Sequence, residues 1–180
     1  MRMRRLVGGA FLAALWLVGC ANGSARDSSQ PGEPTTTMSI ASCVPEPNAK
    51  CVGVDLSGAD LEGVDLHAID LRKANLSGAN LVGADLTHAN MTGANLDGAN
   101  LTDAIAEWSG LNDASLVSAN LTRTRFANAT LLRVDLEGAI FVGAFFTDAT
   151  LEGASGDADF SLAMLCNTTM PDATIEEPTC

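Results

Sequence analysis

Every fifth residue from Leu56 to Leu151 is apolar, and this repeat constrains the fold more than any other property of the chain. It holds across twenty consecutive positions, of which only Ala106 is small. A fixed internal period is typical of solenoids, in which each repeat packs on its neighbours. We call these positions slot residues. They are Leu56, Leu61, Leu66, Leu71, Leu76, Leu81, Leu86, Met91, Leu96, Leu101, Ala106, Leu111, Leu116, Leu121, Phe126, Leu131, Leu136, Phe141, Phe146 and Leu151.

A period of five fits neither ordinary secondary structure. On an α-helix of about 3.6 residues per turn, the slot residues would spiral over the whole surface. On a flat strand they would alternate between the two faces. The pattern is satisfied if the chain bends at every repeat, so that all slot residues point at one axis.

The residues around each slot agree with this bend. The residue two before a slot, here the inner residue, shares its side of a short extended segment, and fourteen of the twenty are alanine. The residue two after a slot, here the corner residue, is glycine in nine of twenty repeats, as a turn requires. The residue directly before a slot, here the flank residue, is Asp or Asn in the first ten repeats.

These residues spell Ala-Asp/Asn-Leu-X-Gly, as in 59–63, 79–83 and 94–98. The motif resembles that of the pentapeptide-repeat family, and the resemblance covers about residues 52–177. It implies an all-β fold, a right-handed quadrilateral β-helix with four pentapeptides per coil and about six coils. Leucine, phenylalanine and alanine would fill its axis.

The repeat slips once after Leu151, because nine residues separate it from the next apolar centre. One residue is therefore lost near 153–156, and we expect a local kink followed by a sixth coil. The later centres are Phe160, Leu165, Met170 and Ile175.

The first 42 residues differ from the repeat. Residues 1–19 combine a basic start with a thirteen-residue apolar run, which is typical of an export signal. The run ends in Leu-Val-Gly-Cys20, which resembles the lipobox of bacterial lipoproteins and implies lipidation at Cys20. An ordinary secretory peptide is the alternative. Residues 20–42 are rich in Ser, Thr, Pro and Gly, so we expect a lipidated, flexible tether before a rod at 43–180.

The other four cysteines fall at the two ends of the expected rod. Exported proteins retain disulfides, and a solenoid needs capped ends. Four cysteines allow three pairings, and we favour Cys43–Cys51 and Cys166–Cys180 because the rod separates the two pairs. Their spacings fit zinc poorly, so we expect no metal.

Few residues suggest chemistry. His67 and His88 lie one coil apart on one side, which leaves open a metal-dependent protein or enzyme, although solvated turn residues are the simpler interpretation. We expect stacked flank residues such as Asn80, Asn100 and Asn120 to form hydrogen-bonded ladders. The sequence has no nucleophile–base arrangement, phosphate loop or cofactor motif, so we predict no catalytic residues, no enzyme and no cofactor.

The chain is acidic, with a net charge of −12. Loss of three arginines with the signal leaves seven Lys and Arg against 22 Asp and Glu, a charge of −15. The resemblance to the family includes acidic DNA mimics that protect gyrase, which gives one alternative function. An export signal and a surface interrupted by Asn and Arg oppose it, and acidity also serves solubility. We expect no binding to nucleic acid.

In the second half of the repeat, apolar residues replace several Asp and Asn flanks. On a twenty-residue coil Ile105, Trp108, Arg125 and Phe145 share one face, here called the Trp108 face. An apolar cluster on a polar rod can be an interaction surface for a second copy or a protein partner. Irregular loops that fold these side chains onto the rod are the alternative. The sequence thus favours a lipid-anchored, non-catalytic binding or scaffold module on the extracytoplasmic side of the bacterial membrane.

Overall fold

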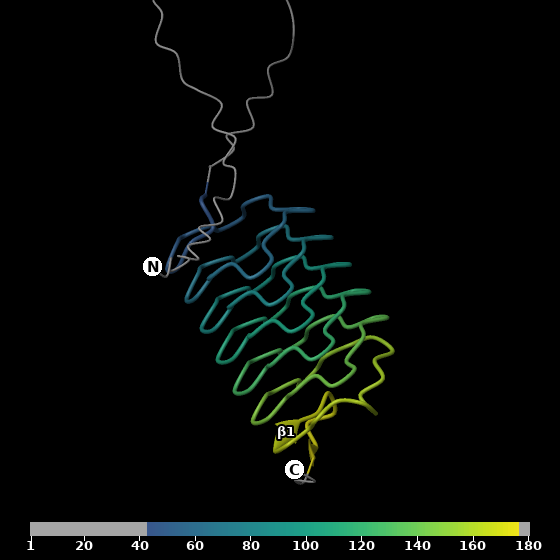
Figure 1. Ribbon diagram of the computed structural model, residues 1–180. Helices are drawn as coiled ribbons and strands as arrows, with labels where there is room; N and C mark the ends of the chain where they lie inside the picture. The colour runs from purple at the N-terminus through teal and green to yellow at the C-terminus, as the bar shows by residue number, and fades with distance from the viewer. Residues whose placement is uncertain (1–42, 177–180) are drawn as a thin grey trace, which may run out of the picture. The chain divides into compact units, whose positions relative to one another are not determined.

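Flank residues twenty positions apart pair in parallel β-bridges, so four pentapeptides make one coil. The bridges run from Lys50↔Asp70 to Asp135↔Ser155 without interruption. The computed structural model describes residues 43–176, which wind into stacked four-sided coils (Figure 1). The all-β, right-handed quadrilateral β-helix predicted from the repeat is confirmed.

The core lies along the axis of the coils. All slot residues from Leu61 to Leu151 are buried, and Leu56 packs against them with partial exposure. Leu81 is fully buried, whereas the next residue, Val82, keeps contact with solvent. The predicted division into inward slots and outward neighbours is therefore correct.

Two inner residues are polar and fully enclosed, and each satisfies its hydroxyl within the rod. Ser109 donates a hydrogen bond of 2.7 Å to the Ala106 carbonyl. Thr124 donates one of 2.7 Å to the Leu101 carbonyl of the preceding coil. Because a buried hydroxyl without a partner is costly, these bonds let small polar residues replace alanine on the axis.

The backbone conformation of the corner residues explains why glycine is common there. Every corner residue from Gly53 to Gly153 has a positive φ, close to 60°. This left-handed region suits glycine, and other L-residues enter it at a cost. Residues as large as Trp108, with φ of 59°, nevertheless occupy it here.

Flank Asp and Asn residues fold back on their own turns. Their side-chain oxygens accept the N–H two residues on, as Asn100 does from Thr102 at 3.1 Å. This short turn, closed by a side chain, explains the preference for Asp and Asn at the flank. The expected ladder through Asn80, Asn100 and Asn120 is wrong: the three pair through their backbones, and the Asn80 amide donates to Asp60 at 2.9 Å.

The coil is one residue short after Ser155. Ser155 pairs with Asp135 at a spacing of twenty, but Phe145 pairs with Met164 at nineteen. Gly156 has φ of +100°, and a Cβ there would lie 2.4 Å from the Glu137 backbone nitrogen. The lost residue predicted near 153–156 thus belongs to the segment that follows Ser155, where only glycine permits the close approach.

The C-terminal end closes differently from the other coils. Two short strands, β1 (Thr168–Thr169) and β2 (Ile175–Glu176), pair antiparallel. Thr168 is buried and donates to the Phe146 carbonyl at 2.6 Å, which ties the pair to the fifth coil. The sixth coil therefore ends in a fold-back that the repeat does not predict.

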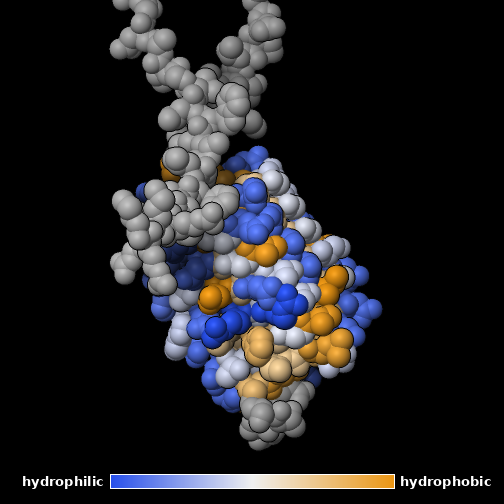
Figure 2. All heavy atoms as spheres, in the orientation of Figure 1, coloured by the Kyte–Doolittle hydropathy of each residue, from blue (hydrophilic) through white to orange (hydrophobic). Residues whose placement is uncertain are grey.

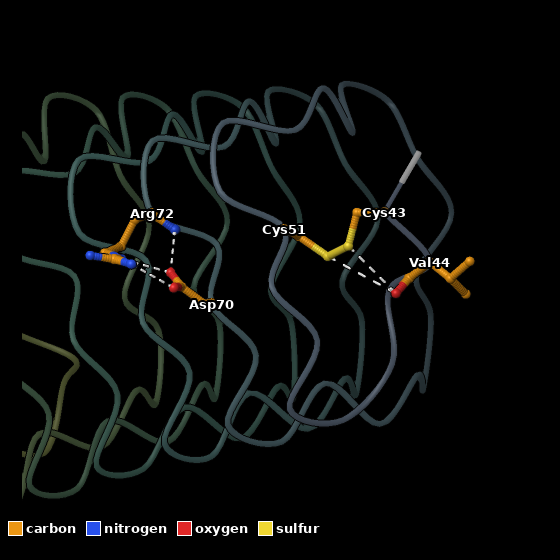
Figure 3. The surroundings of a disulfide bond; sticks show 5 residues. All are labelled: Cys43, Val44, Cys51, Asp70 and Arg72. Carbon is orange, nitrogen blue, oxygen red and sulfur yellow. Dashed lines mark hydrogen bonds and ion pairs between the residues drawn. A yellow bond between two sulfur atoms is a disulfide. The ribbon is translucent and has the colours of Figure 1, made fainter. Parts of the chain in front are cut away.

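The N-terminal end carries a disulfide between Cys43 and Cys51, whose Cα atoms are 5.3 Å apart. Cys51 is buried at the start of the first coil, and the bond holds residues 43–51 beside it (Figure 3). Cys166 is also disulfide-bonded. Cys180 lies outside the described residues, so its predicted pairing with Cys166 stays a prediction.

Candidate interaction face

Three residues of the Trp108 face stand in one β-ladder. Ile105 pairs with Arg125, and Arg125 pairs with Phe145, on consecutive coils. Phe145 is 36% exposed, whereas Ile105 is partly buried. The predicted grouping of these side chains on one side of the rod is therefore what the structure shows, and the loops suggested as an alternative are regular repeats.

Trp108 lies at the corner next to this ladder. It is 57% exposed, and its ring stacks on His88 with centroids 6.2 Å apart and an angle of 26° between the planes. A bulky side chain at positive φ is an unfavourable choice for a turn. Since the core does not use this side chain, the observation favours a role at the surface.

Arg125 is held in place by Glu107. Its guanidinium Nη2 lies 2.6 Å from Glu107 Oε1, while more than half of the Arg125 side chain stays exposed. An exposed ion pair adds little stability, but it fixes the direction of a planar group that could bind a partner's carboxylate. The predicted Arg125 is thus presented at the surface with its charge partly compensated.

The two histidines continue the corner towards the N-terminus. His67 and His88 have ring centroids 5.5 Å apart at 89°, an edge-to-face contact. Hydrogen bonds from the Thr87 hydroxyl and, more weakly, its N–H hold the pKa of Asp85 below its usual value, against the effect of partial burial. The His67 charge acts in the same direction. In the described part of the chain, no group of three or more His, Cys, Asp or Glu is arranged to bind a metal.

The exposed apolar surface extends beyond the predicted face. Met164 continues the ladder after Phe145 and is 53% exposed. Ile140, Val142 and Leu162 lie exposed on the adjoining side. Figure 2 shows apolar side chains gathered towards the C-terminal end of the rod. The register change brings Met164 beside Phe145, so a strict twenty-residue spacing misses it.

The lipidation residue Cys20 and the tether at 20–42 lie outside the described residues. Between residues 43 and 176 no helix has the length and apolar character needed to cross a membrane.

The family of this chain is established by a direct match to a family model. The model of the Pentapeptide repeats family matches eight copies, over residues 49–87, 79–116 and 119–155. The chain belongs to the pentapeptide-repeat family. No curated protein sequence matches it significantly.

Several solved structures are similar to this chain. HetL, a pentapeptide repeat protein involved in heterocyst differentiation regulation in Nostoc sp. strain PCC 7120, is 30% identical, with coverage of 72% of this chain and 67% of HetL and a TM-score of 0.49. Rfr23 of Cyanothece 51142 is 28% identical, with coverage of 60% and 87% and a TM-score of 0.54. A thylakoid-lumen member from Arabidopsis thaliana is 34% identical, with coverage of 56% and 66% and a TM-score of 0.40. Pentapeptide-repeat proteins are generally non-enzymatic, and no catalytic family matches this chain.

Proposed function

We propose that this protein is a bacterial lipoprotein whose pentapeptide-repeat rod binds a protein partner, or a second copy, through the Trp108 face. The observation that carries the proposal is Trp108, a large exposed side chain at a positive φ that the core does not need. Aromatic and arginine side chains contribute most to interface energies, and Arg125 and Phe145 follow Ile105 on the next two coils of the adjacent ladder. The rigid coil holds all three in fixed positions without the entropy loss of ordering a loop.

The lipid anchor rests on the sequence around Cys20. An export signal that is removed cannot hold the rod at a membrane, so retention depends on acyl chains. Cys20→Ala should release the rod from the membrane fraction or leave it unprocessed. Ser24→Ala is a matched control, because it changes a nearby residue and leaves both the lipobox and the disulfides intact. Membrane retention and electrophoretic mobility unchanged by Cys20→Ala would contradict the anchor.

A second candidate is an acidic mimic that sequesters a nucleic-acid-binding protein such as gyrase. The flank residues of the first coil, Asp55, Asp60, Asp65 and Asp70, favour it, since all four are acidic. Arginines compensate part of the acidic charge in the first coil and in later ones: Arg72 Nη2 lies 2.7 Å from Asp70 Oδ2, and Arg123 Nη2 lies 2.6 Å from Asp103 Oδ2. QnrB1, a plasmid-mediated fluoroquinolone resistance protein at 18% identity and a TM-score of 0.33, has too distant a likeness to decide between the candidates.

One pair of measurements separates the two candidates. Fractionation of intact cells tests whether the protein lies in the envelope, away from cytoplasmic gyrase. Purified mature protein added to a gyrase supercoiling assay tests mimicry directly. Membrane retention without inhibition supports the anchored binding module, whereas a cytoplasmic protein that inhibits supercoiling supports the mimic.

A further inference from the structure

The lysines and arginines of the first two coils all lie on one side of the rod. Lys50 pairs with Asp70 in a β-bridge, and Arg72 and Lys73 follow Asp70 in the chain. No other lysine or arginine occurs between residues 46 and 90. We call this surface the Lys50 side. It consists of Lys50, Val52, Asp70, Arg72 and Lys73.

The carboxylates of the same two coils lie mostly on the other three sides, along the ladders that start at Asp55, Asp60 and Asp65. The acidic residues there are Asp55, Asp60, Glu62, Asp65 and Asp85. The Lys50 side contains Asp70, and Glu46 precedes it in the chain. Even with both counted, three cations stand against two carboxylates. An acidic chain thus has a local positive surface at the N-terminal end of its rod.

The cations of the Lys50 side are available to a ligand. Lys50 and Lys73 are exposed, and among residues 43–176 neither forms an ion pair with a carboxylate. Arg72 donates to Asp70 through two hydrogen bonds of 2.8 and 2.7 Å, but 52% of its side chain stays exposed. The hydrogen bond from Arg72 holds the pKa of Asp70 below its usual value, and the charges of Arg72 and Lys50 act in the same direction. Asp70 therefore remains ionised and compensates only part of this charge.

Two exposed valines adjoin these cations. Val52 is 49% exposed and occupies the place of Arg72 one coil earlier, where the Gly53 N–H donates to the Arg72 carbonyl at 2.8 Å. Val44 is 69% exposed, and the disulfide holds it at the end of the rod, with Cys51 Sγ 4.0 Å from its carbonyl oxygen (Figure 3). Apolar side chains beside cations suit the boundary between lipid headgroups and acyl chains.

The length of the preceding chain limits how far an anchored rod can be from lipid. Twenty-two residues, 21–42, separate Cys20 from Cys43, where the described rod begins. A segment of this length spans at most about 80 Å when fully extended. A lipid on Cys20 would make contact with the membrane surface intramolecular, so even a weak interaction would be populated.

We propose that the Lys50 side rests on an anionic phospholipid surface and sets the orientation of the anchored rod. This inference rests on the lipid anchor of the proposed function. The three cations bind lipid phosphates, and Val44 and Val52 enter the headgroup boundary. At physiological salt, charges act over about 8 Å, so carboxylates on the other sides of the rod oppose this contact only weakly. Each Lys or Arg near an anionic surface strengthens binding by about fivefold.

Fluorescence quenching by brominated lipids tests the contact. Full-length lipidated protein is reconstituted into vesicles of brominated phosphatidylcholine and phosphatidylglycerol. The reporter is Val52→Trp, made together with Trp108→Asn because Trp108 is the one tryptophan outside residues 1–19. Val82→Trp in the same background is the control, since Val82 has the same repeat position as Arg72, half a coil further on. The reporter at position 52 should be quenched and that at position 82 should not, and vesicles of phosphatidylcholine alone should not quench either.

Two charge variants separate the Lys50 side from the net charge of the chain. Lys50→Gln with Lys73→Gln should lower the docking equilibrium constant about 25-fold, so that quenching at position 52 is lost. Arg123→Gln with Arg133→Gln removes the same charge from later coils and should leave quenching intact. Quenching that survives the lysine changes, or that is equal at positions 52 and 82, would overturn the inference.

Flotation of the same vesicles distinguishes failure of the anchor from failure of the contact. Protein that floats with the vesicles but shows no quenching at position 52 would contradict the proposed contact and leave the anchor standing. Protein that does not float would contradict the anchor of the proposed function, and the inference with it.

Discussion

Replacement of Trp108 separates a binding residue from a packing residue. Trp108→Asn puts at this corner the residue that the equivalent corner of the next coil, Asn128, already uses at φ of 58°. The change removes the stacking on His88, which contributes about 0.5–1.5 kcal/mol. It also relieves about 1 kcal/mol of left-handed backbone strain, since Asn tolerates this region. The free energy of unfolding should therefore change by less than about 1.5 kcal/mol.

Phe126→Ala is the control for a packed aromatic residue. Phe126 is fully buried and stacks on Phe146 with centroids 5.1 Å apart, so its loss should cost about 3–5 kcal/mol. Urea unfolding followed by circular dichroism measures both variants. Trp108→Asn should leave unfolding nearly unchanged but lower self-association or partner crosslinking per folded molecule. A loss of 3 kcal/mol or more, with association unchanged, would show that Trp108 is packed structure.

Three further outcomes follow from the fold. Leu81→Asp should destabilise the rod severely because it places an unpaired charge on the axis, whereas Val82→Asp should be nearly neutral. Equal effects of the two changes in thermal melts would refute the assignment of slot residues to the interior. Non-reducing mass spectrometry should find Cys166 joined to Cys180, and a free thiol at Cys180 in envelope-derived protein would exclude this cap. Hydrogen bonds and arginines lower the pKa of several flank and corner aspartates, including Asp103, so the stability they contribute is present above about pH 4 and falls as these groups protonate. Equal urea midpoints at pH 6 and pH 3 would contradict this predicted loss of stability in acid.

The residues along the axis of this rod could be predicted from the sequence because every coil repeats the same packing. A slot such as Leu81 and the alanine two residues before it occupy equivalent places in every coil, so one argument covers them all. Corner glycines such as Gly78 similarly mark the left-handed turn. The same regularity placed Ile105, Arg125 and Phe145 on one ladder.

Features that depend on a single deviation could not be predicted. The spacing shows that one residue is lost after Leu151, but not that Gly156 approaches the Glu137 backbone or that Phe141 loses its hydrogen bond. The ion pair between Arg125 and Glu107 depends on side-chain rotamers, which a repeat pattern does not specify.

Photo-crosslinking in intact cells tests the central proposal most directly. A photoreactive residue at position 108 of the full chain would probe the Trp108 face. The same residue at Ser118 would probe the equivalent corner, also at positive φ, half a coil further on. The account predicts a discrete membrane-associated crosslinked product from position 108 and none from position 118. Equal products from both positions, or products only from position 118, would show that the rod does not bind through this face.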